Sequence, residues 1–169
     1  MDTMLASSLQ SVISEFVVTN RNNYYRLAYS IVKDRDDALA IVQDSIRKAL
    51  ANQSSLHDAS IVGPWFYRIV VNTAIDHVRK NDRCVCVVDD SLETLAGGVE
   101  DEPTHADLRK IIEQLSVRDR TVIALRYFEE LKIEEVAQVM DENVNTIKTR
   151  IIALLKKMRL SLESMETNF

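Results

Sequence analysis

The segment LKIEEVAQVMDENVNTIKTRIIALLKKMR, from Leu131 to Arg159, predicts two helices joined by a short turn. Apolar residues recur at helical spacing on both sides of the polar tripeptide Asp141-Glu142-Asn143. Asn143 is suited to cap the second helix, because its side-chain oxygen can accept a hydrogen bond from a free amide of the first turn. This is the spacing of a helix-turn-helix, in which the small Ala137 lets the two helices approach closely. The apolar positions are Ile133, Val136, Ala137, Met140, Val144, Ile147, Ile151, Leu154 and Leu155.

The outward face of the second helix carries side chains that can bond base edges or phosphates. No Asp or Glu occurs between Asn143 and Leu162, and three further cations follow in the same helix. An amphipathic helix with a solvated basic face is the alternative, but the capped turn, the small residue and the acid-free helix together favour DNA contact. Asp141 stands where such turns often have glycine, so a left-handed conformation costs more there. The residues that we expect to contact DNA are Asn145, Thr146, Lys148, Thr149 and Arg150.

The composition of the 169 residues favours an all-α protein of one medium domain or two small ones. Three glycines and two prolines are very few, and helix-forming residues predominate. The first ten residues lack the basic start of a signal peptide, and no apolar run approaches the roughly 18 residues of a membrane span. We therefore expect a cytoplasmic protein without membrane insertion.

The net charge of -5 argues against indiscriminate nucleic-acid binding, but the charge is unevenly distributed. Residues 84 to 104 hold six acids and no Lys or Arg, and outside this segment 21 basic residues stand against 20 acidic ones. The segment also contains Gly97-Gly98 and is too polar to fold alone. We expect an acidic flexible linker at residues 84–103 between helical domains at 1–83 and 104–169. The second domain should have four helices, one starting at Pro103 and the next capped by Ser116.

The N-terminal half contains a predicted helix that starts with N-cap residues at Asp34 to Asp37 and ends near Ala51. Its outward face is an ordinary wet surface or a partner surface, and composition alone does not choose between them. A polar loop follows at residues 52–63, and Pro64 suits the first position of the next helix. The outward residues are Ala40, Gln43, Asp44 and Arg47.

The helix PWFYRIVVNTAIDHVRK, residues 64–80, has one apolar face and one mixed face. An aromatic ring among amides and cations is suited to stacking and hydrogen bonding with unpaired bases. The alternative is that Trp65 and Ile69 pack beneath the preceding loop or a neighbouring helix, and for Ile69 this alternative is favoured. The core face holds Tyr67, Val70, Val71, Ala74 and Val78, and the opposite face holds Trp65, Arg68, Ile69, Asn72, Asp76, Arg79 and Lys80.

Residues suited to catalysis or metal binding are scattered along the chain. The histidines at 57, 77 and 105 lie in different segments, and no Gly-rich phosphate loop follows a strand. Cys84 and Cys86 lack the further ligands of a tetrahedral metal site, so we interpret them as reduced thiols without a metal role. We expect no enzyme, no cofactor, no metal and no small-molecule substrate.

Three runs, DALAIVQDSIRKAL, WFYRIVVNTAIDHVRK and LSVRDRTVIALRYFEELKIEEVAQVMDENVNTIKTRIIALLKKMR, closely resemble the sigma-70 family, specifically its short extracytoplasmic-function (ECF) sigma factors. The resemblance covers about residues 24 to 159. It implies a subunit that binds core RNA polymerase, directs it to specific promoters and assists melting of the start site. It also implies two DNA-binding domains joined by a linker, and an anti-sigma factor as a further partner.

The resemblance also implies roles for particular residues. Gln43, Asp44 and Arg47 would contact the β′ subunit of the polymerase, although an acidic residue is common in the family where Ala40 stands. The -10 element would be opened and read by Trp65, Arg68, Asn72, Asp76, Arg79 and Lys80, with a flipped base held by the loop at residues 54–63. The helix-turn-helix would read the duplex -35 element. The acidic linker would thread through the polymerase active-site cleft and RNA exit channel, or else serve only as a solubilising linker.

Two other classes of protein remain open at this point. A free-standing helix-turn-helix regulator would have no use for a second DNA-facing helix with Trp65, and it usually needs a dimer interface. A helical interaction module such as an anti-sigma adaptor would not need the acid-free basic helix. A gel shift with and without core polymerase would separate these hypotheses.

Overall fold

The computed structural model describes residues 2–82 and 103–167, and every regular element in these two ranges is helical. The N-terminal set is α1 (Asp2–Thr19), α2 (Arg21–Val32), α3 (Arg35–Ala51), η1 (Gln53–Ser55), η2 (Ala59–Ile61) and α4 (Val62–Asp82). The C-terminal set is α5 (Pro103–Gln114), α6 (Val117–Ile123), η3 (Ala124–Phe128), α7 (Ile133–Met140) and α8 (Val144–Thr167). The all-α prediction is thus confirmed.

The N-terminal set is built around aromatic side chains at the meeting point of α1, α2 and α4. Tyr24 is fully buried, with its ring centroid 4.6 Å from that of Phe66 and 5.0 Å from that of Tyr67, both in edge-on orientation. Such pairs add to the stability that the burial of apolar area provides. α3 begins where predicted, because the Asp34 side chain accepts a hydrogen bond from the Asp37 amide at 2.9 Å.

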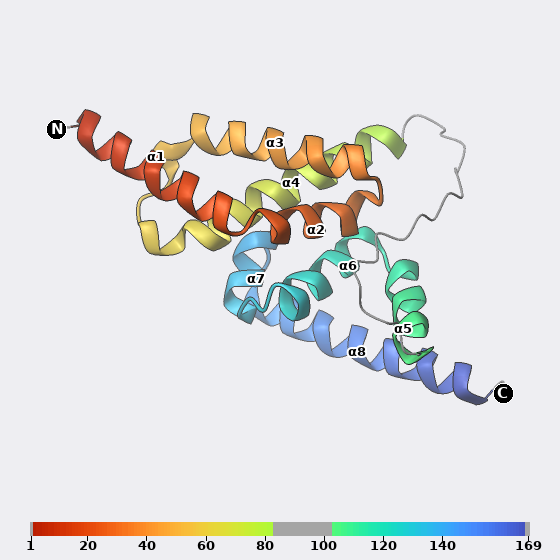
Figure 1. The fold of residues 1–169 in the computed structure, drawn as a ribbon. Coiled ribbons are helices and arrows are strands. Elements are labelled where there is room, and N and C mark those ends of the chain that lie inside the picture. Colours follow the sequence, from red (N-terminus) through yellow and green to blue (C-terminus); the bar gives the residue numbers. More distant parts are fainter. Residues whose placement is uncertain (1, 83–102, 168–169) are drawn as a thin grey trace.

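The C-terminal set contains the predicted helix-turn-helix, formed by α7 and α8 (Figure 1). α6 precedes it and is capped by Ser116, whose hydroxyl accepts from the Asp119 amide at 3.2 Å, as predicted. The carboxyl-terminal half of α8 lies along α5. A small apolar cluster joins them, formed by Ile111, Leu115, Ile123, Leu154 and Met158.

The two sets of helices share one hydrophobic core. α6 and α7 lie directly under α2 and α4 in Figure 1, and buried residues of both sets form one continuous cluster. Val70 and Val71 of α4 belong to this cluster together with Val136 and Val139 of α7. The cores of the two sets are therefore not separate.

Some local predictions need correction. α4 starts at Val62, two residues before Pro64, because η2 leads directly into the helix. The segment at residues 52–63 contains two 3-10 turns, and its Leu56 is buried in the core. The predicted acidic linker, with Cys84 and Cys86, lies outside the described residues except for Pro103, which begins α5. No helix in the part of the chain that the structure describes is long and apolar enough to cross a membrane.

Candidate nucleic-acid interface

The turn of the helix-turn-helix has the geometry that its sequence requires. Asp141 ends α7 in the left-handed region, with φ 53° and ψ 47°, at the position predicted to be costly for a residue other than glycine. The Asn143 side chain accepts a hydrogen bond from the Asn145 amide at 2.8 Å, which confirms its capping role. Ala137 is buried and belongs to the core that both sets share. The start of α8 is therefore held in a defined direction.

The first two turns of α8 present an open polar face. Asn145, Thr146, Lys148 and Thr149 are all exposed. Ile152 lies one turn after Lys148 on the same face and is 68% exposed. An exposed aliphatic side chain between cations can contact a thymine methyl group in the major groove. The sequence analysis did not select Ile152, although its position outside the apolar stripe of α8 was a usable signal.

Arg150 lies on the side of α8 that faces its own domain. Its guanidinium is 3.3 Å from Glu142 in the turn and 3.6 Å from Asp119 in α6. A cation between two carboxylates from different elements holds the turn against α6. The structure thus separates Arg150 from the four exposed polar residues of this face, and its contact with DNA stays a prediction.

α4 presents the second polar face. Arg68, Asn72, Asp76, Arg79 and Lys80 are exposed along one side of the helix, as their spacing predicts. Arg68 lies 3.6 Å from the carboxylate of Asp141 in the helix-turn-helix. Four of the six residues predicted for the -10 element lie between Asn72 and Lys80. Their side chains are exposed, and within residues 2–82 and 103–167 they form no ion pair.

Trp65 at the start of α4 is fixed by the preceding loop. Its indole Nε1 donates to the Ser55 hydroxyl at 3.1 Å, and its ring is half-buried against the core. Ile69 is also half-buried against the core. Both residues therefore pack against neighbouring segments, as the alternative interpretation predicted. Only part of the Trp65 ring is open to a base.

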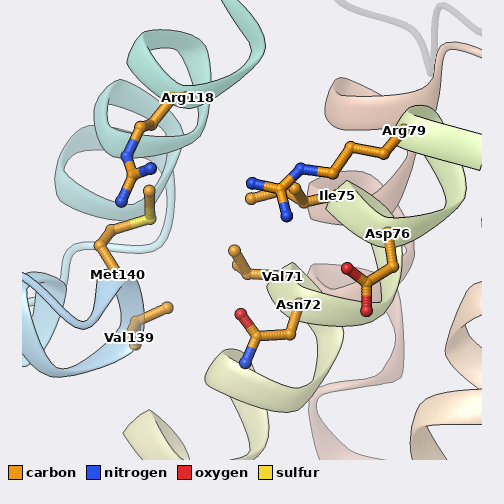
Figure 2. A pocket seen from close by; sticks show the side chains of 8 residues that line it. All are labelled: Val71, Asn72, Ile75, Asp76, Arg79, Arg118, Val139 and Met140. Atoms are coloured by element: carbon orange, nitrogen blue, oxygen red, sulfur yellow. The ribbon is translucent and has the colours of Figure 1, made fainter. Parts of the chain in front are cut away.

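A cleft separates the polar face of α4 from the C-terminal set (Figure 2). Its volume is about 230 Å³. In Figure 2 the side chains of Arg79 and Arg118 extend into the space from opposite walls, with Asn72 and Asp76 at its edge. Its walls are Val71, Asn72, Ile75, Asp76 and Arg79 of α4, Arg118 of α6, and Val139 and Met140 of α7.

The outward face of α3 lies away from the C-terminal set. Gln43 and Arg47 are exposed, and Asp44 forms ion pairs with Arg47 and Lys48. Burial opposes ionisation of Asp44, but the hydrogen bonds and charges of Arg47 and Lys48 together hold the pKa of its carboxyl below the ordinary value. Leu39 lies one turn before Gln43 and is 42% exposed, so this charged face includes an apolar side chain that the sequence analysis did not select.

Comparison with known families assigns both sets of helices. Residues 16–84 match the family Sigma-70 region 2, and residues 105–158 match Sigma-70, region 4. The chain is 43% identical over 146 residues to the RNA polymerase sigma factor SigV of Bacillus subtilis (strain 168), covering 86% of this chain and 88% of that protein. This chain belongs to the sigma-70 family. It is an ECF sigma factor, a non-enzymatic subunit of RNA polymerase that directs transcription initiation.

Other members of the sigma-70 family support the same assignment. The ECF sigma factor SigW of Bacillus subtilis (strain 168) is 30% identical over 157 residues, with 84% of each chain covered. The fold matches that of the sigma factor RpoE of Bartonella quintana, solved in complex with the anti-sigma factor NepR, with a TM-score of 0.73. That match has 23% identity and covers 89% of this chain and 96% of the other. A free-standing regulator and an interaction module are thereby set aside.

Proposed function

We propose that this sigma factor uses three separate helical faces for three contacts. The outward face of α3, with Gln43, Asp44 and Arg47, binds core RNA polymerase, mainly through the β′ subunit. The polar face of α4, with Trp65 at its start, binds the melted -10 element of the promoter. The exposed face at the start of α8 reads the duplex -35 element. The observation that carries this proposal is that regions 2 and 4 of the family fall on two helical sets, each with an exposed polar face.

The chain would divide functionally at the segment between these sets. Residues 1–83 form the unit for core polymerase and the -10 element, residues 84–103 connect, and residues 104–169 form the unit for the -35 element. Because all three contacts are made with polymerase and promoter DNA, the protein acts in the cytoplasm.

Run-off transcription with bacterial core RNA polymerase tests the proposed contacts. The purified chain should comigrate with core polymerase in gel filtration and direct discrete transcripts from fragmented DNA of the source organism. Arg47→Ala should lower the affinity for core polymerase, whereas Arg21→Ala, a change of the same charge at an exposed position of α2, should not. Failure of the wild-type chain to bind the cognate core polymerase would refute the proposal.

An anti-sigma factor is the further partner that we propose. The related RpoE was solved bound to the anti-sigma factor NepR, and the fold of that sigma factor spans most of this chain. Affinity purification of the chain from its own host should recover a protein that blocks run-off transcription when it is added back. Recovery with polymerase subunits alone would contradict this part of the proposal.

A further inference from the structure

One exposed aliphatic side chain interrupts the polar face of α8. Ile152 is 68% exposed, and within residues 2–82 and 103–167 it belongs to neither of the two apolar clusters. The buried residues of the same helix lie along another side and are Ile147, Ile151, Leu154 and Met158. Single exposed apolar side chains are common on protein surfaces, so the neighbours of Ile152 decide what it can bind.

The neighbours of Ile152 along the outer side of α8 are polar or cationic. Helical periodicity places it on nearly the same line as Asn145, Thr149 and Lys156, all of which are exposed. Residues 144–161 contain no Asp or Glu. A partner that is anionic and also carries apolar groups matches this combination. The major groove of DNA is such a partner, because it presents thymine methyl groups between two lines of phosphates.

Contacts within the C-terminal set limit what the polar side chains next to Ile152 can offer to a base. The Thr149 hydroxyl donates to the backbone carbonyl oxygen of Asn145 at 2.9 Å, so toward DNA it offers an acceptor and a methyl group. Arginine is the commonest partner of guanine, but the guanidinium of Arg150 is held by the two carboxylates described above. The apolar groups of Ile152 and Thr149, one turn apart, are therefore well suited to a thymine methyl group.

We propose that Ile152 is a specificity-determining residue, which reads one thymine of the duplex -35 element through the C5-methyl group of that base. Thr149 borders the same contact, and Lys148 and Lys156 bind the flanking phosphates. The contact favours T·A over C·G, because cytosine has no methyl group at that position. This role of Ile152 rests on the proposed function of α8, and it adds which side chain and which group on the base decide the sequence preference.

Replacement of single thymines by uracil tests this contact, because uracil differs from thymine only by the missing C5-methyl group. The probe is a fluorescent duplex that carries the -35 element of a promoter recovered by run-off transcription. The protein is the full chain bound to core polymerase, and fluorescence anisotropy measures its affinity for each duplex. At one thymine of the element the replacement should weaken binding about fourfold, as expected for the loss of one buried methyl group.

Ile152→Ala and Leu160→Ala form a matched pair of variants. Leu160 is 56% exposed on the same helix, roughly 12 Å further along its axis, and lies outside the proposed contact. The uracil that weakens binding of the wild type should weaken binding of Leu160→Ala equally. It should have no effect on Ile152→Ala, because that variant has already lost the contact. Urea denaturation should show equal stability for both variants, since both side chains are exposed.

Three results would overturn the role of Ile152. In the first, the wild type prefers the promoter duplex to a scrambled one but tolerates uracil at every thymine of the element. In the second, Ile152→Ala keeps the full effect of uracil. In the third, Ile152→Ala loses core polymerase in gel filtration, which would show that this face binds protein. A wild type that does not distinguish the promoter from the scrambled duplex would refute the proposed function of α8 as well, so the two failures differ.

Discussion

The helices α4 and α8 carry the same mixture of amide and cationic side chains on their outer faces, yet their surroundings differ. Asn145 and Lys148 of α8 face solvent, whereas Asn72 and Arg79 of α4 line a cleft whose other wall is the C-terminal set. Helical spacing decides which side chains point outward from a helix. What lies opposite them is decided by the packing of segments that are far apart in the sequence. The comparison shows that helical spacing predicts the outward side chains of both helices, but not that those of α4 lie beside a cleft.

The largest effect that we expect comes from Arg120, which joins the two sets. Arg120→Ala leaves the carbonyl oxygens of Ser30, Ile31 and Leu115 without their guanidinium donor. Hydrogen bonds from a charged group contribute about 1.5–3 kcal/mol each, and the acceptors on Ile31 and Leu115 belong to buried residues, so the free energy of unfolding should fall by about 3 kcal/mol. Urea denaturation measures this loss.

Arg118→Ala is the control for Arg120. Its side chain is 49% exposed and pairs with Glu142 within the C-terminal set, so its removal should cost about 1 kcal/mol or less. An equal loss of stability for both variants would mean that the contact between the two sets contributes little.

The second prediction distinguishes side chains of α8 that contact DNA from side chains that stabilise the fold. Lys148→Ala should lower the affinity for the duplex -35 element about tenfold and reduce the slope of its salt dependence by about 1, with unfolding unchanged. Arg150→Ala should also lower the free energy of unfolding, by about 1 kcal/mol, because Asp119 and Glu142 lose their shared cation. Fluorescence anisotropy and urea denaturation give the two quantities. Loss of stability in both variants would show that this face of α8 is structural.

Features that depend on neighbours in the chain were predictable from the sequence. The caps at Asp34, Ser116 and Asn143 and the left-handed residue Asp141 occur as expected, because each is set by a few consecutive residues. The outward faces of α3, α4 and α8 followed from helical spacing.

Features that depend on contacts between distant segments were not predictable in the same way. Arg150 shares the polar face with Lys148 in the sequence pattern, but Asp119, 31 residues earlier, draws it toward α6. The sequence around Arg120 does not indicate that it will be buried against α2, because its acceptors there are backbone carbonyl groups, which every residue has. The packing of the C-terminal set beside α4 is the sum of such contacts.

The third prediction concerns Asp141, which ends α7 just before α8 and pairs with Arg68 of α4. Its left-handed backbone costs roughly 1–2 kcal/mol for most residues but less for Asn and Asp, while its pair with Arg68 is exposed and weak. Asp141→Asn should therefore leave the melting temperature nearly unchanged, and Asp141→Ala should lower stability by about 1 kcal/mol. Thermal unfolding by circular dichroism compares the two variants. If Asn costs as much as Ala, the ion pair with Arg68 is the larger contribution.

The smallest effect that we expect is a dependence of the free energy of unfolding on pH, which arises at Glu129. Burial raises the pKa of its carboxyl, while the Tyr67 hydroxyl and the charge of Arg26 act in the opposite direction. A carboxyl with a raised pKa in the folded chain takes up a proton there more readily than in the unfolded chain. The contribution of Glu129 to folding stability is therefore complete below its ordinary pKa, and it is lost as the pH rises through the raised value.

Urea denaturation from pH 4.5 to pH 8 tests this sign. The free energy of unfolding of the wild type, measured relative to that of Glu129→Gln, should fall as the pH rises, because the ionised carboxylate is less favourable in its partly buried site than in the unfolded chain. Glu129→Gln keeps a similar shape and cannot ionise, whereas Glu130→Gln, the same change at an exposed position, should retain the pH dependence of the wild type. A difference that rises with pH would mean that the hydrogen bond from Tyr67 and the charge of Arg26 outweigh the burial of the carboxylate.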